Sequence, residues 1–259
     1  MCRPEHFDVV STLNPWMDPT LPVSRPTAIA QWENLVDLYE GLGHRVDLVQ
    51  PGIGLPDMVF AANAGVAIDN RMMAAVMWSE ERRPEEAYFR KHFDRAGFDE
   101  VFIPEHVNEG EGDFLFTGDV LLAGTGFRTD PRAHVEAQQF FDIEVVTLQL
   151  VDPRWYHLDT ALFVINSELA VWYPGAFDAA SVAELRRRFP DGIEATGADA
   201  LAFGLNSTAD GRHVVMPAPA ADLAHRVARA GFEVHRVDLS ELLKAGGSVK
   251  CCTLELNVS

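Results

Sequence analysis

One pattern recurs along the chain and constrains its fold more than any other feature: an amphipathic helix, a break, and a short strand. The break and strand occur five times, at intervals of roughly 40 to 55 residues. Repetition on this scale is typical of chains built from similar structural modules. We therefore expect five such modules. The five copies are residues 43–49, 97–103, 141–147, 190–196 and 231–237.

The segments around these copies have the matching periodicities. Apolar residues recur at helical spacing over 32–42, 182–189 and 223–230, each directly before a break. Apolar segments predict a strand pair over 58–68 and 72–78, with Asp69-Asn70 at the turn. A second pair is expected over 162–165 and 169–172, around Asn166-Ser167.

The pattern predicts one α/β domain over residues 1–259, made of about five ββαβ modules. A Rossmann sheet is not expected, because no Gly-x-Gly-x-x-Gly motif follows a first strand.

Charge and composition exclude several functional classes. The chain has 21 Lys+Arg and 39 Asp+Glu residues, a formal charge of −18. Such a field repels nucleic acid and anionic membranes and favours cationic ligands, although an acidic surface also simply aids solubility. Apolar runs are too short to span a membrane. Three cysteines, an odd number, argue against a disulfide framework. We expect a cytoplasmic protein.

Two of the three cysteines are adjacent, Cys251 and Cys252, and they follow Gly246-Gly247. A thiolate is the strongest nucleophile among the side chains, and glycines allow a ligand to approach the backbone closely. The alternative is a pair of ordinary buried strand cysteines, before an apolar/polar alternation that ends the chain. Because strand side chains alternate between faces, only one of the two can face a given pocket.

A histidine and an aspartate, His157 and Asp159, stand two residues apart before an apolar segment. In a strand they would share one face, so the carboxylate could lie beside the imidazole or beside the same substrate. Histidine is the natural proton carrier near neutral pH. The alternative is a surface histidine at a strand entrance.

An acidic turn lies over residues 109–113, where Glu109, Glu111 and Asp113 alternate with two glycines. Its carboxylates could bind a guanidinium, another cation or a metal, although a calcium loop requires more oxygen ligands. An acidic surface turn is the alternative.

Two neutral amides and two arginines complete the candidate set. Asn14 and Asn63 stand among bulky apolar residues, where an amide can hydrogen-bond a polar substrate, or where it can simply form a turn. Arg82 and Arg128 have the planar guanidinium that grips a carboxylate, although Arg82 also fits a solvated helix start.

Taken in order, these motifs resemble the pentein superfamily of guanidine-modifying enzymes. The resemblance extends over the whole chain and implies a five-bladed α/β propeller with pseudo-fivefold symmetry, in agreement with the five copies. It is carried by Asp57 with Asn63, by Glu109-Gly-Glu-Gly-Asp113, by His157-Leu-Asp159-Thr, and by Gly246-Gly247 before Cys251.

The resemblance also implies roles for these residues. Cys251 corresponds to the nucleophile, His157 to the general acid/base and Glu109 to its acidic partner. Asp57 and Asp159 correspond to carboxylates that bind the guanidinium. Arg82 and Arg128 correspond to arginines that hold the substrate's α-carboxylate.

The chain departs from the superfamily pattern at the acidic turn, where many relatives have Glu-Gly-Gly-Asp. The extra residue leaves open whether Glu109 or Glu111 faces the pocket. The signatures around Asn14 and Asn63 are most similar to arginine dihydrolase, which converts arginine to ornithine, carbon dioxide and ammonia. Dimethylarginine dimethylaminohydrolase is the next alternative, followed by arginine deiminase and the amidinotransferases.

The expected enzyme is thus a hydrolase of a small guanidino compound, without a cofactor or metal. A different class, a non-catalytic propeller that binds a ligand, remains open, as does a structural zinc protein, although Cys-x-x-Cys and His-Glu-x-x-His are both missing from the sequence. Nucleic acid and membrane partners are not expected, and a homo-oligomer is left open.

Overall fold

Residues 1–256, described here in a computed structural model, contain four three-stranded sheets of one design. In each sheet two strands form an antiparallel hairpin, and the third pairs with the second in parallel. The four sheets are β1 (Gly65–Ile68), β2 (Arg71–Ala74) and β3 (Glu100–Phe102); β4 (Phe114–Phe116), β5 (Val120–Thr125) and β6 (Glu144–Gln149); β7 (Leu162–Val164), β8 (Ala170–Trp172) and β9 (Ile193–Glu194); and β10 (Thr208–Ala209), β11 (His213–Pro217) and β12 (Glu233–Val237).

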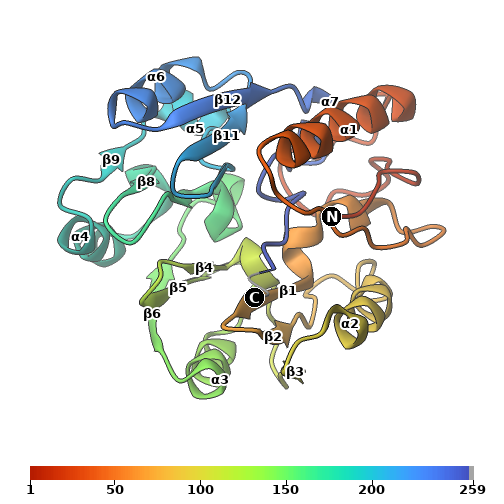
Figure 1. Cartoon of the computed structure of the whole chain (residues 1–259), viewed down its shortest axis with the longest axis horizontal. Coiled ribbons are helices and arrows are strands. Elements are labelled where there is room, and N and C mark those ends of the chain that lie inside the picture. Colours follow the sequence, from red (N-terminus) through yellow and green to blue (C-terminus); the bar gives the residue numbers. More distant parts are fainter. Residues whose placement is uncertain (257–259) are drawn as a thin grey trace.

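A parallel third strand requires a crossover, and in every sheet a helix provides it. These helices lie on the outer side of the ring of sheets (Figure 1). The sheets and helices thus form the ββαβ modules that the repeated pattern predicts. The crossover helices are α2 (Glu85–Ala96), α3 (Pro131–Phe141), α4 (Ala179–Arg188) and α6 (Ala221–Arg229).

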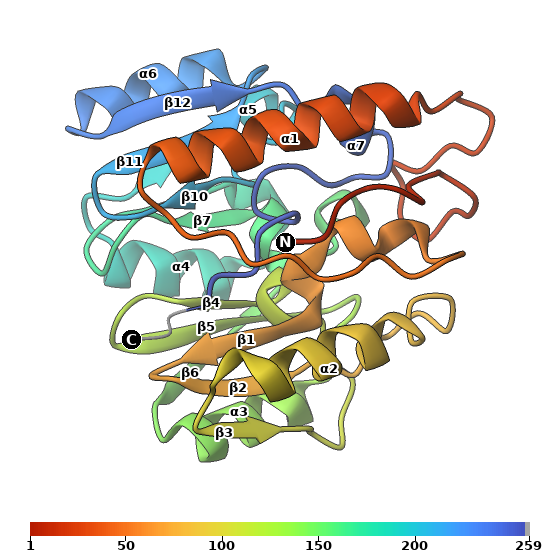
Figure 2. The same ribbon diagram turned by 45° about the vertical axis from the view of Figure 1, so that its right-hand side comes forward.

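The first module has a different form. Its helix, α1 (Arg25–Gly41), is present, but in the described residues the strand expected over 43–49 is reduced to one parallel bridge between Cys2 and Val49. The prediction of a full strand there is wrong. Helix α1 lies beside α7 (Ser240–Leu243), near the other end of the chain (Figures 1 and 2). Gln31 of α1 donates hydrogen bonds to Asp238 and Ser240, which closes the ring.

Short 3₁₀ turns precede the first strands of three modules and contact one another in sequence around the centre. Each turn leads directly into its strand, so side chains of equivalent position converge at the axis. The turns are η2 (Ala61–Ala64) before β1, η3 (Gly110–Gly112) before β4, and η5 (Leu158–Thr160) before β7.

Two strand predictions fail at these turns. In the predicted strand 58–68 only β1 is extended, because η1 (Pro56–Val59) and η2 occupy its first half. The segment with His157 and Asp159 is likewise the turn η5 and not a strand. The hairpin turn is confirmed, since Asp69 and Asn70 both have positive φ, 49° and 60°, as a two-residue hairpin connection requires.

Apolar side chains fill the spaces between sheets and helices. The largest cluster joins the sheets β4–β5–β6, β7–β8–β9 and β10–β11–β12, with Trp155 and Trp172 fully buried in it. Within residues 1–256, every helix is too short or too polar to cross a bilayer.

Candidate active site

Seven of the nine predicted site residues line one narrow pocket at the centre of the ring, and the other two contact its lining. The cavity is small, about 20 Å³, which is room for roughly one water molecule. Apolar groups of Leu13, Met17 and Phe60 complete the wall. The seven residues are Asn14, Asp57, Asn63, Arg82, Arg128, His157 and Cys251.

Cys251 lies in a tight turn that both glycines make possible. Gly246 has φ +76°, a left-handed conformation that favours glycine. At Gly247 a Cβ atom would lie 2.2 Å from the ring of Phe60, so a side chain cannot be accommodated. The strand alternative for the cysteines is therefore wrong, since residues 249–252 form turns.

The Sγ atom of Cys251 contacts two buried polar groups. Its thiol donates to Oδ2 of Asp159 over 3.2 Å, and Nδ2 of Asn206 donates to Sγ over 3.1 Å. Burial, followed by the charge of Asp159, raises the pKa of Cys251 well above its usual value. Burial also raises the pKa of Asp159 to about 6. Both shifts favour the thiol form of Cys251, and a positive charge placed beside Sγ would favour the thiolate.

Asn206 holds the nucleophile's turn in place. Its Oδ1 accepts the backbone N–H groups of Ser248 and Cys251, both over 3.1 Å. Its Nδ2 also donates to Oδ2 of Asp159 over 3.0 Å. Asn206 is fully buried just before β10, the position that η2, η3 and η5 occupy in the other modules. Sequence reasoning missed this residue, and only its place in the repeat could have indicated it.

Cys252 does not line the pocket that Cys251 lines. It is fully buried in the apolar cluster that contains Leu35 and Tyr39 of α1. Burial raises its pKa far above the usual range of a thiol. The expectation that only one of the two cysteines can serve a pocket fits this arrangement, with Cys251 on the pocket side.

His157 faces Glu109 across the pocket wall. Their Nε2 and Oε2 atoms are 3.5 Å apart, and both side chains are buried. The other oxygen of Glu109 accepts the backbone N–H of Trp78 over 2.7 Å. Burial acts to raise the pKa of Glu109, but His157, Arg82 and Arg128 outweigh it and lower that pKa to about 2. Glu109 is thus an anion positioned to stabilise an imidazolium.

Glu111 pairs with Lys250, whereas Glu109 is the glutamate of the acidic turn that faces His157. Its Oε2 lies 2.7 Å from Nζ of Lys250, and Lys250 also pairs with Glu255. Burial alone would lower the pKa of Lys250, but the two carboxylates outweigh it and raise that pKa. The lysine beside Cys251 therefore ties the nucleophile's turn to the turn that carries Glu109.

The glycines of the acidic turn permit close approach. At Gly112 a Cβ atom would lie 2.3 Å from Nδ2 of Asn63, and at Gly110 one would lie 2.5 Å from the backbone N of Gly65. Asp113 ends the turn, and its Oδ1 accepts the backbone N–H of Leu158, next to His157, over 3.0 Å. Asp113 thus aligns His157 from the neighbouring module.

Asp57 presents an unpaired carboxylate. It is buried, and its Oδ1 has no hydrogen-bond partner among residues 1–256. Oδ1 of Asp159 also has no hydrogen-bond partner in that part of the chain, and Oε2 of Glu109 has none there beyond its ion-pair contact with His157. Burial raises the pKa of Asp57, against the effect of Arg82 and Arg128. Buried carboxylate oxygens without donors favour a cationic ligand with several N–H groups.

Arg82 is buried and not solvated, so the solvated alternative for it is wrong. Its guanidinium pairs with Glu85 over 2.9 Å and donates to Oδ1 of Asn63 over 2.8 Å. Its Nη2 also donates to the backbone oxygens of Asp57 and Phe60. An arginine has five N–H donors, and these contacts leave about one for a ligand. A role in holding a substrate carboxylate stays a prediction; its contacts position Asn63 and Asp57.

Arg128 is the more available arginine. Its guanidinium stacks over Trp78 and Tyr156, at 4.3 and 4.9 Å from the ring centroids, and donates to the backbone oxygen of Leu13. Stacking fixes the plane of the guanidinium and leaves N–H groups at its edge free to bind a carboxylate.

Asn14 closes the outer side of the pocket. Its Nδ2 donates to the hydroxyl of Tyr156 and to the backbone oxygen of Ala245, over 3.1 and 3.0 Å, and its Oδ1 accepts the N–H of Trp16. The amide is thus engaged by protein groups, as a turn residue would be.

Comparison with known proteins agrees with this fold and indicates a family. Residues 17–258 match the family described as N,N dimethylarginine dimethylhydrolase, eukaryotic. The chain is 48% identical to the N(G),N(G)-dimethylarginine dimethylaminohydrolase of Mycobacterium tuberculosis, over 99% of this chain and 85% of that protein.

A second group of relatives is cyanobacterial. The chain is 38% identical to the bifunctional arginine dihydrolase/ornithine cyclodeaminase ArgZ of Synechocystis, over 99% of this chain but only 37% of that protein. The solved N-terminal domain of ArgZ bound to product superposes with a TM-score of 0.94, covering 98% of this chain and 95% of the domain. The chain thus spans the arginine dihydrolase domain of ArgZ and about a third of its length.

Fold and site together define a cysteine-dependent, guanidine-modifying enzyme of the pentein superfamily. Within that superfamily, the chain belongs to the dimethylarginine dimethylaminohydrolase family.

Proposed function

We propose that this protein hydrolyses the guanidino group of arginine or a close analogue through a covalent intermediate on Cys251. The observation that carries the proposal is the contact of the Cys251 thiol with Asp159, beside His157 and the unpaired carboxylate of Asp57. A structure of a cysteine-to-serine variant of the ArgZ domain bound to substrate, and another with a covalent intermediate, support the same chemistry.

The carboxylates drive the first step. Asp57 and Asp159 bind the guanidinium and fix its plane, and its positive charge favours the thiolate of Cys251. The thiolate attacks the guanidino carbon, His157 protonates the leaving nitrogen, and an amine departs. Glu109 stabilises the imidazolium form of His157 before that proton transfer.

Water then completes the reaction. His157 takes a proton from water, the resulting hydroxide attacks the amidino carbon, and the C–S bond breaks to leave a urea and a free cysteine. From arginine this turnover gives citrulline and ammonia. A second attack on the ureido carbon gives ornithine, so that arginine and two waters become ornithine, carbon dioxide and two ammonia.

Arginine dihydrolysis is our first assignment. Asn63, held between Arg82 and the backbone oxygen of Glu109, is a neutral amide, so its position adds no further carboxylate to those of Asp57 and Asp159 opposite the uncharged ureido group of citrulline. Dimethylarginine hydrolysis is the second candidate, and the relative from Mycobacterium tuberculosis favours it.

One assay separates the two assignments. The enzyme is incubated with arginine and, separately, with asymmetric dimethylarginine, and ornithine, citrulline, ammonia and dimethylamine are measured. We expect ornithine and two equivalents of ammonia from arginine. Citrulline and dimethylamine from the methylated substrate, with arginine left intact, would establish the second candidate. Inertness toward both would leave a ligand-binding propeller.

The two glutamates of the acidic turn provide a matched pair of variants. Glu109→Gln removes the counter-ion of the His157 imidazolium, so kcat is expected to fall by about 10²–10⁴-fold. Glu111→Gln is expected to weaken the pair with Lys250 and lower the Tm, while kcat stays within about tenfold. Steady-state kinetics and thermal unfolding check both, and equal losses of kcat would contradict the role of Glu109.

Replacement of Glu109 is also expected to change how the free energy of unfolding depends on pH. Its pKa, about 2 in the folded protein, lies below its ordinary value of 4.5. Its contribution to stability is therefore fully present above pH 4.5 and is lost as the pH falls toward 2. In acid unfolding measurements, Glu109→Gln should therefore lose less stability than the wild type between pH 4.5 and pH 2.

The expected partner is accordingly a small guanidino compound. A cytoplasmic location and a homo-oligomer stay predictions.

A further inference from the structure

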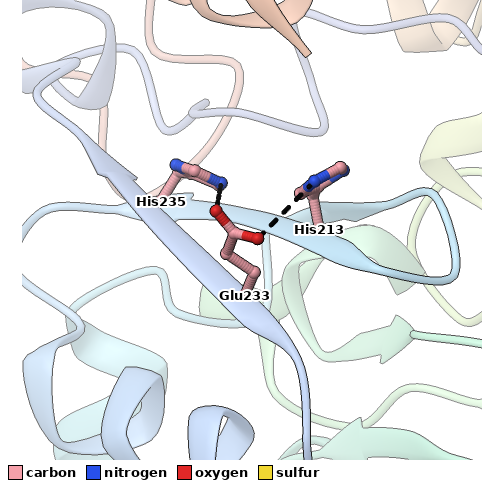
Figure 3. A group of neighbouring side chains, drawn as sticks. All are labelled: His213, Glu233 and His235. Atoms are coloured by element: carbon pink, nitrogen blue, oxygen red, sulfur yellow. Dashed lines mark ion pairs between the residues drawn. The ribbon is translucent and has the colours of Figure 1, made fainter. Parts of the chain in front are cut away.

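A histidine–glutamate–histidine group lies on the sheet β10–β11–β12, apart from the pocket of Cys251. His213 begins β11, and Glu233 and His235 belong to β12 (Figure 3). The parallel register pairs His213 with Glu233, and His235 follows two residues later on the same face. Side chains that are 20 residues apart in the sequence thus become neighbours. We propose that this group binds one zinc-type divalent transition metal ion.

The distances fit such a site. One ligand atom from each of the three side chains lies within 4.8 Å of the other two. Nε2 of His213 is 3.8 Å from Oε2 of Glu233, and Nε2 of His235 is 3.6 Å from Oε1. Zinc bonds of about 2.0–2.2 Å place tetrahedral ligands roughly 3.3 Å apart, so small side-chain rotations bring the three onto one ion.

His235 provides a second observation. Its Nε2 is buried yet has no hydrogen-bond partner among residues 1–256, although the residue itself is partly exposed. In Figure 3 this nitrogen points at the carboxylate of Glu233. A buried ring nitrogen without a donor or acceptor is costly in an apoprotein, and coordination would satisfy it.

A carboxylate behind the site orients His213. Oδ2 of Asp210 lies 2.7 Å from Nδ1 of His213, which leaves Nε2 for the metal. Oδ1 of Asp210 accepts the backbone N–H groups of Arg212 and His213, so the carboxylate is itself fixed. Histidine ligands in metal sites commonly have such a carboxylate partner.

An arginine and a further histidine adjoin the group. Arg212 lies 3.4 Å from Oε2 of Glu233, and His44 lies 3.1 Å from Oδ2 of Asp210. Arg212 is mostly exposed and can swing away, so it competes for Glu233 without blocking it. Two imidazoles and one carboxylate favour Zn²⁺ over Ca²⁺ or Mg²⁺, and three ligands leave a fourth position open to solvent.

The test has to separate this site from the catalytic thiol, which can also bind zinc. Zn²⁺ binding is measured by equilibrium dialysis on wild type, on Cys251→Ser, and on His213→Ala, His235→Ala, Asp210→Asn and His225→Ala, each combined with Cys251→Ser. His225→Ala, an exposed histidine on α6, is the matched control. Circular dichroism verifies folding of each variant.

We expect Cys251→Ser, alone or combined with His225→Ala, to bind one Zn²⁺. His213→Ala and His235→Ala should lose at least about 100-fold in affinity, and Asp210→Asn about 10–100-fold. Co²⁺ bound to Cys251→Ser should show ligand-field absorption without thiolate charge transfer. Binding that disappears in Cys251→Ser, or that survives in both histidine variants, overturns the proposal.

Discussion

Replacement of Cys251 by serine is expected to lower kcat by about 10⁶-fold, as for removal of a covalent nucleophile in other hydrolases. A serine hydroxyl at this position has Asp159 beside it, but its pKa is far above that of a thiol, and the alkoxide is not formed at neutral pH. The variant should also fail to form the covalent adduct that arginine gives with the wild-type protein. Mass spectrometry of the intact protein detects this adduct.

Cys252→Ser is the matched control. Its side chain lies in an apolar cluster and not on the pocket, so a buried hydroxyl is expected to cost about 1–3 kcal/mol and lower the Tm by several degrees. Turnover of the folded protein should stay within about tenfold. Equal loss of kcat in both variants would contradict the assignment of the nucleophile.

The fold was largely predictable from the five helix–break–strand copies. Their strands appear as β3, β6, β9 and β12, and the copy at 43–49 is the exception. Within the described residues, that copy pairs only with the short N-terminal segment, through the bridge between Val49 and Cys2, and has no hairpin beside it. Periodicity predicts a strand only where a partner strand exists to pair with it.

The residues of the site could be named from the sequence, but their local structure could not. Short apolar runs between Asp57 and Asn63 and next to His157 resemble strands, yet these segments form 3₁₀ turns. Short apolar segments do not distinguish a buried turn from a strand. The apolar/polar alternation at the end of the chain also resembles a strand, but residues 253–256 are irregular. Asn257 and Val258 lie outside the described residues.

Choices between neighbouring residues also required the three-dimensional structure. Glu109 and Glu111 are two residues apart on one turn, and only contacts from other modules, His157 for the first and Lys250 for the second, distinguish them. Asn206 gave no local signal, because an asparagine before a two-residue strand resembles any loop residue. Its importance follows from pseudo-symmetry, which brings the residue before each module's first strand to the axis.

Asn206→Ala is expected to lower kcat by about 10²–10³-fold, the usual effect of removing one donor aimed at developing negative charge. The variant loses the N–H group that contacts Sγ of Cys251 over 3.1 Å. A donor to the thiolate lowers a thiol pKa, so its removal raises the pKa of Cys251 further. The acid limb of the kcat profile should therefore move to higher pH.

A structural role alone would give a different result, and Leu205→Ala provides the comparison. Leu205 is the fully buried apolar neighbour of Asn206, and its truncation should cost about 2–5 kcal/mol without touching Sγ. Asn206→Ala also leaves the backbone N–H groups of Ser248 and Cys251 unpaired, so both variants should unfold at lower temperature. Only Asn206→Ala should shift the pH profile. An unshifted profile with a lowered Tm would reduce Asn206 to a residue that merely stabilises the turn, because the charge on sulfur would then be independent of its amide.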